Sequence, residues 1–147
     1  DAFVASDVIT YKEEMTELLK DRRKTMPVNA IHERAKISTH AAMGYGNMIE
    51  SGAVVNAFAE LKNHIIVGSN AVVDADVKLD DFVNIGAGTI VNAGVEIGAS
   101  AYVGSGVTIV AGIKVGKNAR IGAGSVVVKN VEEGETVFGN PASVVKK

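Results

Sequence analysis

The chain has 147 residues, of which 47% are hydrophobic, a size that supports one main domain around a single core. Its 15 Lys and Arg residues nearly balance 17 Asp and Glu residues without forming a basic patch, so we expect no nucleic-acid partner. Cysteine is absent, which excludes disulfides, thiolate metal sites and a catalytic thiol.

Residues 1–27 predict a short strand followed by one helix. The strand is expected at residues 2–5 and the helix at residues 10–24, with Thr10 and Glu13 as a capping box. Helical spacing links Tyr11, Met15, Leu18, Leu19 and Arg22. One strand and one helix do not make a domain, and the chain begins without Met, so we expect this segment to be the end of an N-terminal α/β domain.

The first residues lack a signal-peptide layout, and no apolar run in the chain reaches the ~18 residues that span a bilayer. We therefore expect a cytoplasmic protein without membrane insertion.

Residues 28–130 carry a six-residue repeat whose register is never broken. Its seventeen aliphatic positions are Ile31, Ile37, Met43, Ile49, Val55, Leu61, Val67, Val73, Leu79, Ile85, Val91, Ile97, Val103, Ile109, Val115, Ile121 and Val127. A step of six fits short strands joined by tight corners and wound into a solenoid, with three hexads in each triangular coil. We therefore predict a parallel β-helix of about six coils. The fifth position of each hexad supplies a second inward layer, as in Ala53, Ala71, Val77, Thr89, Val95 and Val107.

Fourteen of the 16 glycines fall at the second or the fourth position of a hexad. Sharp corners need backbone torsions that glycine tolerates best, so we predict corners at both positions. Dinucleotide-binding loops are disfavoured because no helical pattern follows these glycines.

Outward residues 18 apart stack in columns, and the columns differ in chemistry. An apolar column predicts a protein interface that closes into a homotrimer: Val54, Val72, Ile90, Thr108 and Val126. A column of alternating charge suits solvent: Glu60, Lys78, Glu96 and Lys114. Beside it runs a column of small residues that allows close approach to the backbone: Ala57, Ala75, Ala93 and Ala111.

Residues 131–147 predict a turn at residues 138–142 and a basic tail that folds back over the last coil.

The segment 109–127, IVAGIKVGKNARIGAGSVV, closed by Gly139-Asn140-Pro141-Ala142, resembles the end of hexapeptide-repeat acyltransferases. The uninterrupted register, the opening Asn29-Ala30-Ile31-His32 and the helix before it are most similar to one branch, the sialic acid O-acetyltransferases and UDP-amino-sugar N-acetyltransferases of bacterial surface-glycan synthesis. The resemblance implies a left-handed β-helix and a homotrimer that binds acetyl-CoA between subunits. It implies direct acetyl transfer, without a metal, to an amine or hydroxyl of a sugar or nucleotide sugar held partly by the N-terminal domain.

The resemblance also places the catalytic site, and this chain departs from the pattern there. The position of the family's catalytic His is Ala75, followed by the acidic Asp76. The family's Asn seven residues earlier corresponds to Gly68, and its second His nine residues later corresponds to Asn84. His64 is a weak candidate for a substitute base, and its corner position favours an ordinary surface histidine. His32 and His40 are weaker candidates still.

For the donor, the resemblance implies CoA contacts at Asn84, Ser105 and Ala123, with the pantetheine arm near Ala93 and Gly94. The alternative, that these residues are small only because coils and subunits pack closely, remains equally open. Four aspartates, Asp74, Asp76, Asp80 and Asp81, favour solvated corners over a cation site. Two functions remain open: an acetyl-CoA-dependent acyltransferase weakened by Ala75, and a catalytically inactive trimeric scaffold or ligand-binding relative.

Overall fold

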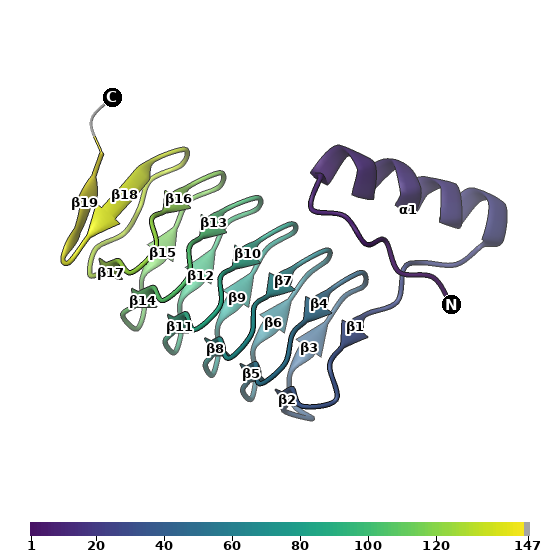
Figure 1. The fold of residues 1–147 in the computed structure, drawn as a ribbon, viewed down its shortest axis with the longest axis horizontal. Helices are drawn as coiled ribbons and strands as arrows, with labels where there is room; N and C mark the ends of the chain where they lie inside the picture. Colours follow the sequence, from purple (N-terminus) through teal and green to yellow (C-terminus); the bar gives the residue numbers. More distant parts are fainter. Residues whose placement is uncertain (146–147) are drawn as a thin grey trace.

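The computed structural model describes residues 1–145, in which one helix, α1 (Ile9–Arg23), precedes a parallel β-helix (Figure 1). Sheet A contains β1 (Ala30–Ile31), β4 (Met48–Ile49), β7 (Ile66–Val67), β10 (Asn84–Ile85), β13 (Tyr102–Val103), β16 (Arg120–Ile121), β18 (Thr136–Gly139) and β19 (Ala142–Val144). Sheet B contains β2 (Lys36–Ile37), β5 (Val54–Val55), β8 (Val72–Val73), β11 (Ile90–Val91), β14 (Thr108–Ile109) and β17 (Val126–Val127). Sheet C contains β3 (Ala42–Met43), β6 (Glu60–Leu61), β9 (Lys78–Leu79), β12 (Glu96–Ile97) and β15 (Lys114–Val115).

The three sheets meet at three corners, which the chain passes in the same order in every coil. Corner AB, between sheets A and B, holds Ser105 and Ala123. Corner BC, between sheets B and C, holds Ala75 and Gly94, and corner CA holds His64. Strands of adjacent coils pair in parallel with partners 18 residues apart, as in Glu96 with Lys114. The column spacing predicted from the repeat is therefore confirmed.

Both inward layers of the predicted repeat form the core. The aliphatic position is buried from Ile49 onward, and the second layer, including Ala53 and Thr89, is buried as well. The first coil differs, because Ile31 is 48% exposed although it continues the aliphatic pattern. Its strand β1 pairs with β4 alone among the described residues, so one side of the first coil has no neighbouring strand.

The two sets of corner glycines serve different purposes, which corrects the prediction that both provide corner torsions. Glycines at the fourth position, such as Gly94, have positive φ angles, as do Asp76 and His64 at equivalent places. Glycines at the second position, such as Gly68, do not. A Cβ on Gly68 would lie 2.7 Å from the backbone nitrogen of Ala87 in the next coil. At most second-position glycines the backbone of the next coil lies this close, so a side chain there would collide with it.

Gly46 combines both constraints, and we expect Gly46→Ala to be more destabilising than Gly134→Ala. Both glycines have positive φ, which costs a side-chain-bearing residue about 1–2 kcal/mol. The new Cβ at 46 would also lie 2.5 Å from Nδ1 of His64, whereas at 134 it meets no atom within 4 Å. Overpacking adds about 1–3 kcal/mol at position 46. Urea unfolding of the two variants measures the difference, and equal losses would contradict this account.

The N-terminal segment differs from its prediction in three respects. Residues 2–5 form no strand, although the backbone N–H of Val28 donates to the carbonyl of Ala2 at 2.8 Å. Helix α1 begins at Ile9 after Val8, with no side-chain cap, so the expected capping box is absent. The buried residues of α1 are Lys12 and Thr16, while Tyr11 and Leu18 are 48% and 40% exposed. The most deeply buried residues of the helix are thus polar, while the apolar Met15 and Leu19 are only half-buried.

The C-terminal segment extends sheet A. Strand β18 pairs in parallel with β16, and β19 returns antiparallel to β18 after the turn at residues 140–141. The predicted turn is therefore present, and the chain after it folds back along β18. The end of the predicted basic tail, residues 146–147, lies outside the described residues.

Candidate active site

Corner BC carries Ala75 and Asp76, the positions where the family resemblance implies the base and its acidic neighbour. Hydrogen bonds along the corner connect successive coils: the N–H of Asp76 donates to the carbonyl of Ala57 at 3.2 Å, and the N–H of Gly94 donates to that of Ala75 at 3.0 Å. Ala75, Asp76, Ala93 and Gly94 are therefore brought together on adjacent coils. A Cβ on Gly94 would meet no atom within 4 Å, so this part of the corner faces open space.

The two carboxylates of corner BC have different roles. Asp74 Oδ1 accepts hydrogen bonds from the Asn56 side-chain amide and from the N–H of Ala75, both at 2.8 Å. The bond from Asn56, followed by that from Ala75, lowers the pKa of Asp74 below its usual range. Asp76 is exposed, and its carboxylate accepts no hydrogen bond within residues 1–145. Asp74 therefore fixes the corner, whereas Asp76 is free to contact a ligand.

The other residues expected to contact CoA lie elsewhere on the coil. Ser105 and Ala123 are at corner AB, and Asn84 is on sheet A in β10. Sheet B separates corner AB from corner BC, so one protomer does not bring Ser105 and Ala123 next to Gly94. Corner AB is also open, because a Cβ on Gly106 or Gly124 would meet no atom within 4 Å.

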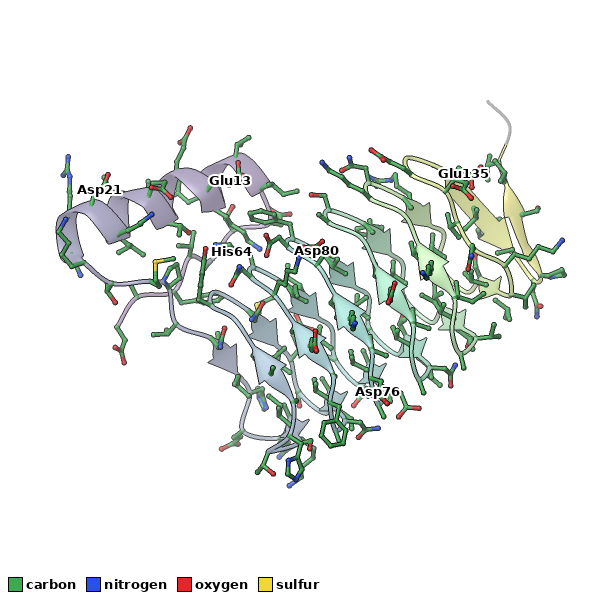
Figure 2. All side chains as sticks on the ribbon, turned by 180° about the vertical axis from the view of Figure 1, so that it is seen from behind. Glu13, Asp21, His64, Asp76, Asp80 and Glu135 are labelled. Carbon is green, nitrogen blue, oxygen red and sulfur yellow. The ribbon has the colours of Figure 1, made fainter. Side chains whose placement is uncertain are left out.

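His64 lies at corner CA, a different corner from Ala75, and Figure 2 shows it beneath α1 with Asp76 at the far edge of the coils. The expectation that His64 is an ordinary surface histidine is wrong, because it is only 4% exposed. Its ring stacks on Phe82 with centroids 5.2 Å apart and meets the edge of Tyr45. Sequence reasoning missed Thr16 and Lys12 as its neighbours, since only the docking of α1 brings them there.

The hydrogen bonds around His64 determine its tautomer. Thr16 Oγ1 lies 3.0 Å from His64 Nε2 and 2.7 Å from the carbonyl oxygen of Lys12. The single hydroxyl proton of Thr16 goes to that carbonyl, so Nε2–H of His64 must be the donor to Oγ1. Nδ1 is then an acceptor, and it is buried without a partner among the described residues. Burial, followed by the charge of Lys12, lowers the pKa of His64 below its ordinary value of 6.5.

We expect acid to destabilise the protein through His64. The folded state binds a proton at His64 less readily than the unfolded state, so the free energy of unfolding falls as pH drops below about 6.5. The pKa values of Asp74 and Asp80 are also lowered, but these carboxylates change the free energy of unfolding only around and below their ordinary pKa of 3.8, outside this range. Urea unfolding between about pH 7.5 and 5 measures the effect. His64→Phe should flatten the pH dependence, whereas His40→Gln, which removes an exposed histidine, should retain it; the reverse result would contradict this assignment.

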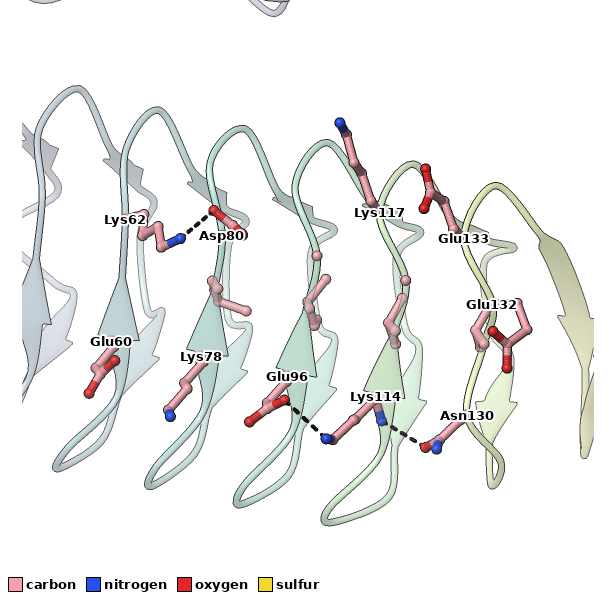
Figure 3. A pocket seen from close by; sticks show the side chains of 16 residues that line it. Glu60, Lys62, Lys78, Asp80, Glu96, Lys114, Lys117, Asn130, Glu132 and Glu133 are labelled. Carbon is pink, nitrogen blue, oxygen red and sulfur yellow. Dashed lines mark hydrogen bonds and ion pairs between the residues drawn. The ribbon is translucent and has the colours of Figure 1, made fainter.

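A groove of about 670 Å³ runs along sheet C (Figure 3). It is lined by the charged column predicted to face solvent, and two ion pairs cross it: Lys62 with Asp80 at 2.9 Å and Lys114 with Glu96 at 3.7 Å. Its lining holds four lysines against five carboxylates, and positive and negative groups are interspersed, so no cluster of one sign marks a ligand. Its volume alone therefore does not identify it as the reaction site.

Within residues 1–145, no group of three or more potential ligands is placed to hold a metal ion. Asp74 and Asp76 lie at corner BC, whereas Asp80 and Asp81 lie toward corner CA, so the four aspartates do not converge. The part of the chain that the structure describes also contains no helix with the length and apolarity needed to cross a membrane.

Comparison with known proteins places this geometry among sugar acetyltransferases. The model of the bacterial transferase hexapeptide (six repeats) family matches residues 94–129. No match is found among curated proteins. The structure superimposes with a TM-score of 0.92 on PerB from Caulobacter crescentus in complex with CoA and GDP-perosamine, at 28% identity over 98% of this chain and 69% of that one.

Two further structures match almost the whole chain. The acetyltransferase domain of PglB from Neisseria gonorrhoeae, in complex with acetyl coenzyme A, is 31% identical over 99% of this chain and 70% of that one, with a TM-score of 0.88. A variant of GDP-perosamine N-acetyltransferase from Caulobacter crescentus with a histidine replaced by alanine, in complex with CoA and GDP-perosamine, is 29% identical over 99% and 69%, with a TM-score of 0.92. The predicted fold class, a left-handed parallel β-helix of about six coils, is confirmed.

Proposed function

Because this chain belongs to the hexapeptide-repeat acetyltransferases of bacterial glycan synthesis, we propose that it transfers the acetyl group of acetyl-CoA to an amino sugar carried by a nucleotide. The observation that carries the proposal is the match of 99% of the chain to an acetyltransferase domain bound to acetyl-CoA. A sugar hydroxyl is the alternative acceptor. The reaction fits a cytoplasmic location, as expected from the sequence.

The proposal includes a homotrimer, because one protomer holds only parts of the expected donor site. Sheet B exposes the apolar column that we predict as the interface, with Ile90 at 42% exposure in the single chain. If the sheet B faces of three protomers surround a threefold axis, corner BC of one protomer approaches corner AB of the next. Ala93 and Gly94 of one subunit would then share a cleft with Ser105 and Ala123 of its neighbour.

Acetyl transfer in this cleft needs little covalent participation from the protein. The sugar amine attacks the thioester carbonyl carbon, the carbon–sulfur bond breaks, CoA leaves as the thiolate, and the nitrogen loses a proton to water or to that thiolate. Ala75 provides no group to accept that proton, and a positioned base is typically worth about 10²- to 10⁴-fold. Holding the two substrates together can supply an effective molarity of about 10⁵ M or more. We therefore expect slow turnover rather than none.

A relative in which one histidine is replaced by alanine supports a chain that binds its ligands without a histidine at position 75. In the Caulobacter crescentus variant, a histidine is replaced by alanine and the crystal still contains CoA and GDP-perosamine. We infer that Ala75 lowers the rate in this chain and leaves substrate binding intact. Asp76, which is exposed and unpaired within residues 1–145, remains available to contact the acceptor.

The second candidate function is a catalytically inactive trimeric scaffold or ligand-binding relative, which Ala75 favours. Thiol release from acetyl-CoA, measured with a panel of amino-sugar nucleotides, separates the two. Acceptor-dependent release by the unmodified chain would remove the scaffold alternative. Binding of acetyl-CoA without thiol release for any acceptor would contradict the proposed enzyme.

A further inference from the structure

A cavity of about 210 Å³ lies between the start of α1 and sheet A, away from corner BC. Its charged lining comes from Lys12 on α1, Arg120 on sheet A and Asp7 just before the helix. The uncharged polar residues of the lining are His64, Asn84, Ser100 and Tyr102. Apolar residues, among them Ile66 and Phe82, complete its walls. The cavity is smaller than the ~300–1,000 Å³ that encloses a whole drug-sized ligand, so it suits one chemical group of a ligand.

Lys12 is buried in this cavity without a counter-ion in contact. The residue is only 5% exposed, and its ammonium has no ion-pair or hydrogen-bond partner within residues 1–145. Burial lowers the pKa of Lys12, and the charge of Asp7 partly opposes this. Most of the Lys12 side chain is buried, while its ammonium nitrogen is not among the fully buried unpartnered atoms and reaches solvent at the cavity. A positive charge with reduced access to water and no counter-ion in contact is one that a bound anion would stabilise.

Arg120 adds a second cation to the same cavity. Its guanidinium carbon lies 5.1 Å from the ring centroid of Tyr102, which orients the planar group along sheet A. None of the ion pairs within the described residues involves Arg120. With Asp7 as the one carboxylate in the lining, the cavity has a net charge of about +1 when His64 is neutral. Helix α1 also starts here without a side-chain cap, and its first-turn amides favour an anion.

We propose that Lys12 and Arg120 form a binding site for a phosphoryl group, between α1 and sheet A. The guanidinium presents planar donors that match phosphate oxygens, and the ammonium supplies a compact point charge. The site rests on the proposed function only for the source of its ligand, which is either the diphosphate of a nucleotide or a phosphate of CoA. Asn84 contributes its side chain to this cavity, which gives it a role distinct from that of Ser105 and Ala123.

Thermal unfolding of the full chain with pyrophosphate tests the site independently of turnover. We expect pyrophosphate to raise the melting temperature more than chloride does at matched ionic strength. Lys12→Met should bind pyrophosphate about ten- to a hundredfold more weakly, because it loses a charge-assisted hydrogen bond. Without ligand, Lys12→Met should melt no lower than the unmodified chain, since it removes a charge that has no counter-ion in contact from a largely buried side chain. Lys20→Met changes an exposed lysine of the same helix and should bind normally.

Two results would overturn the proposal: no protection of the unmodified chain beyond that of chloride, or equal pyrophosphate affinity in Lys12→Met and Lys20→Met. If Lys12→Met does not fold, Arg120→Met makes the same comparison at an exposed residue.

Repeating the series with a nucleoside diphosphate and with CoA then identifies the source of the phosphoryl group. The natural ligand is the compound that raises the melting temperature of the unmodified chain but no longer does so in the variant that has lost the effect of pyrophosphate. An absence of acetyl transfer would leave the result for pyrophosphate unchanged, so failure of the site and failure of the proposed function are distinguishable.

Discussion

Ala75→His should raise kcat for acetyl transfer by about 10²- to 10⁴-fold, the usual contribution of a positioned general base. The imidazole would stand at corner BC beside Asp76, whose carboxylate has no partner among residues 1–145 and can orient it. It would accept the proton that the attacking amine loses. Neighbouring positions at this corner bear Ala93 and Gly94, so the added ring has room in the single chain. Steady-state kinetics with acetyl-CoA and an amino-sugar nucleotide measure the change.

The matched control for this substitution is Ala57→His, at the equivalent position one coil earlier. It introduces the same imidazole on the same corner, next to Phe58 instead of Asp76. A general-base effect predicts a gain at position 75 only, with little change in KM for acetyl-CoA. Equal gains in the two variants, or no gain in Ala75→His while both substrates still bind, would contradict the assignment of this corner.

Ile90→Lys should dissociate the trimer and abolish acetyl transfer with it. Ile90 is central in the apolar column of sheet B, flanked by Val72 and Thr108 on adjacent coils. Three symmetry-related ammonium groups in one interface would be buried without partners, at a cost of several kcal/mol for each. Activity should disappear because each donor cleft needs two subunits. Light scattering should give three times the 15.3 kDa chain mass for the unmodified protein and one chain mass for the variant.

Ala42→Lys is the control for that substitution. It places the same side chain on an outward position of sheet C, opposite Glu60, where it continues the alternating charges. This variant should remain trimeric and active. A monomeric unmodified protein, or a trimeric Ile90→Lys variant, would contradict the proposed interface.

The regular part of the fold was predictable because the repeat encodes it redundantly. Seventeen aliphatic steps set the inward layers, and a spacing of 18 residues set the pairing of Glu96 with Lys114. The role of Gly68 was predicted wrongly, since the close approach of Ala87 appears only when two coils are stacked. The pattern also could not show that the first coil ends the stack and leaves Ile31 exposed.

The surroundings of His64 were beyond prediction because they depend on how α1 docks. Helical spacing pointed to Tyr11 and Leu18, but the helix uses Lys12 and Thr16 against the β-helix. Phe82, one coil above His64, was visible from the column spacing, whereas Thr16 was not. The proposed donor site at Ser105, Ala123, Ala93 and Gly94 has the same difficulty, because its halves meet only between subunits and remain a prediction.

The most direct test of acetyl transfer uses acetyl-CoA labelled with a heavy carbon isotope at the acetyl carbonyl, followed by NMR in the presence of an amino-sugar nucleotide. The carbonyl shift distinguishes thioester, sugar amide and free acetate in one experiment. We predict that the label moves from thioester to sugar amide, slowly with the unmodified chain and faster with Ala75→His. Label that stays on CoA, or that appears only as free acetate with both proteins, would contradict the proposal that this β-helix is an amino-sugar acetyltransferase.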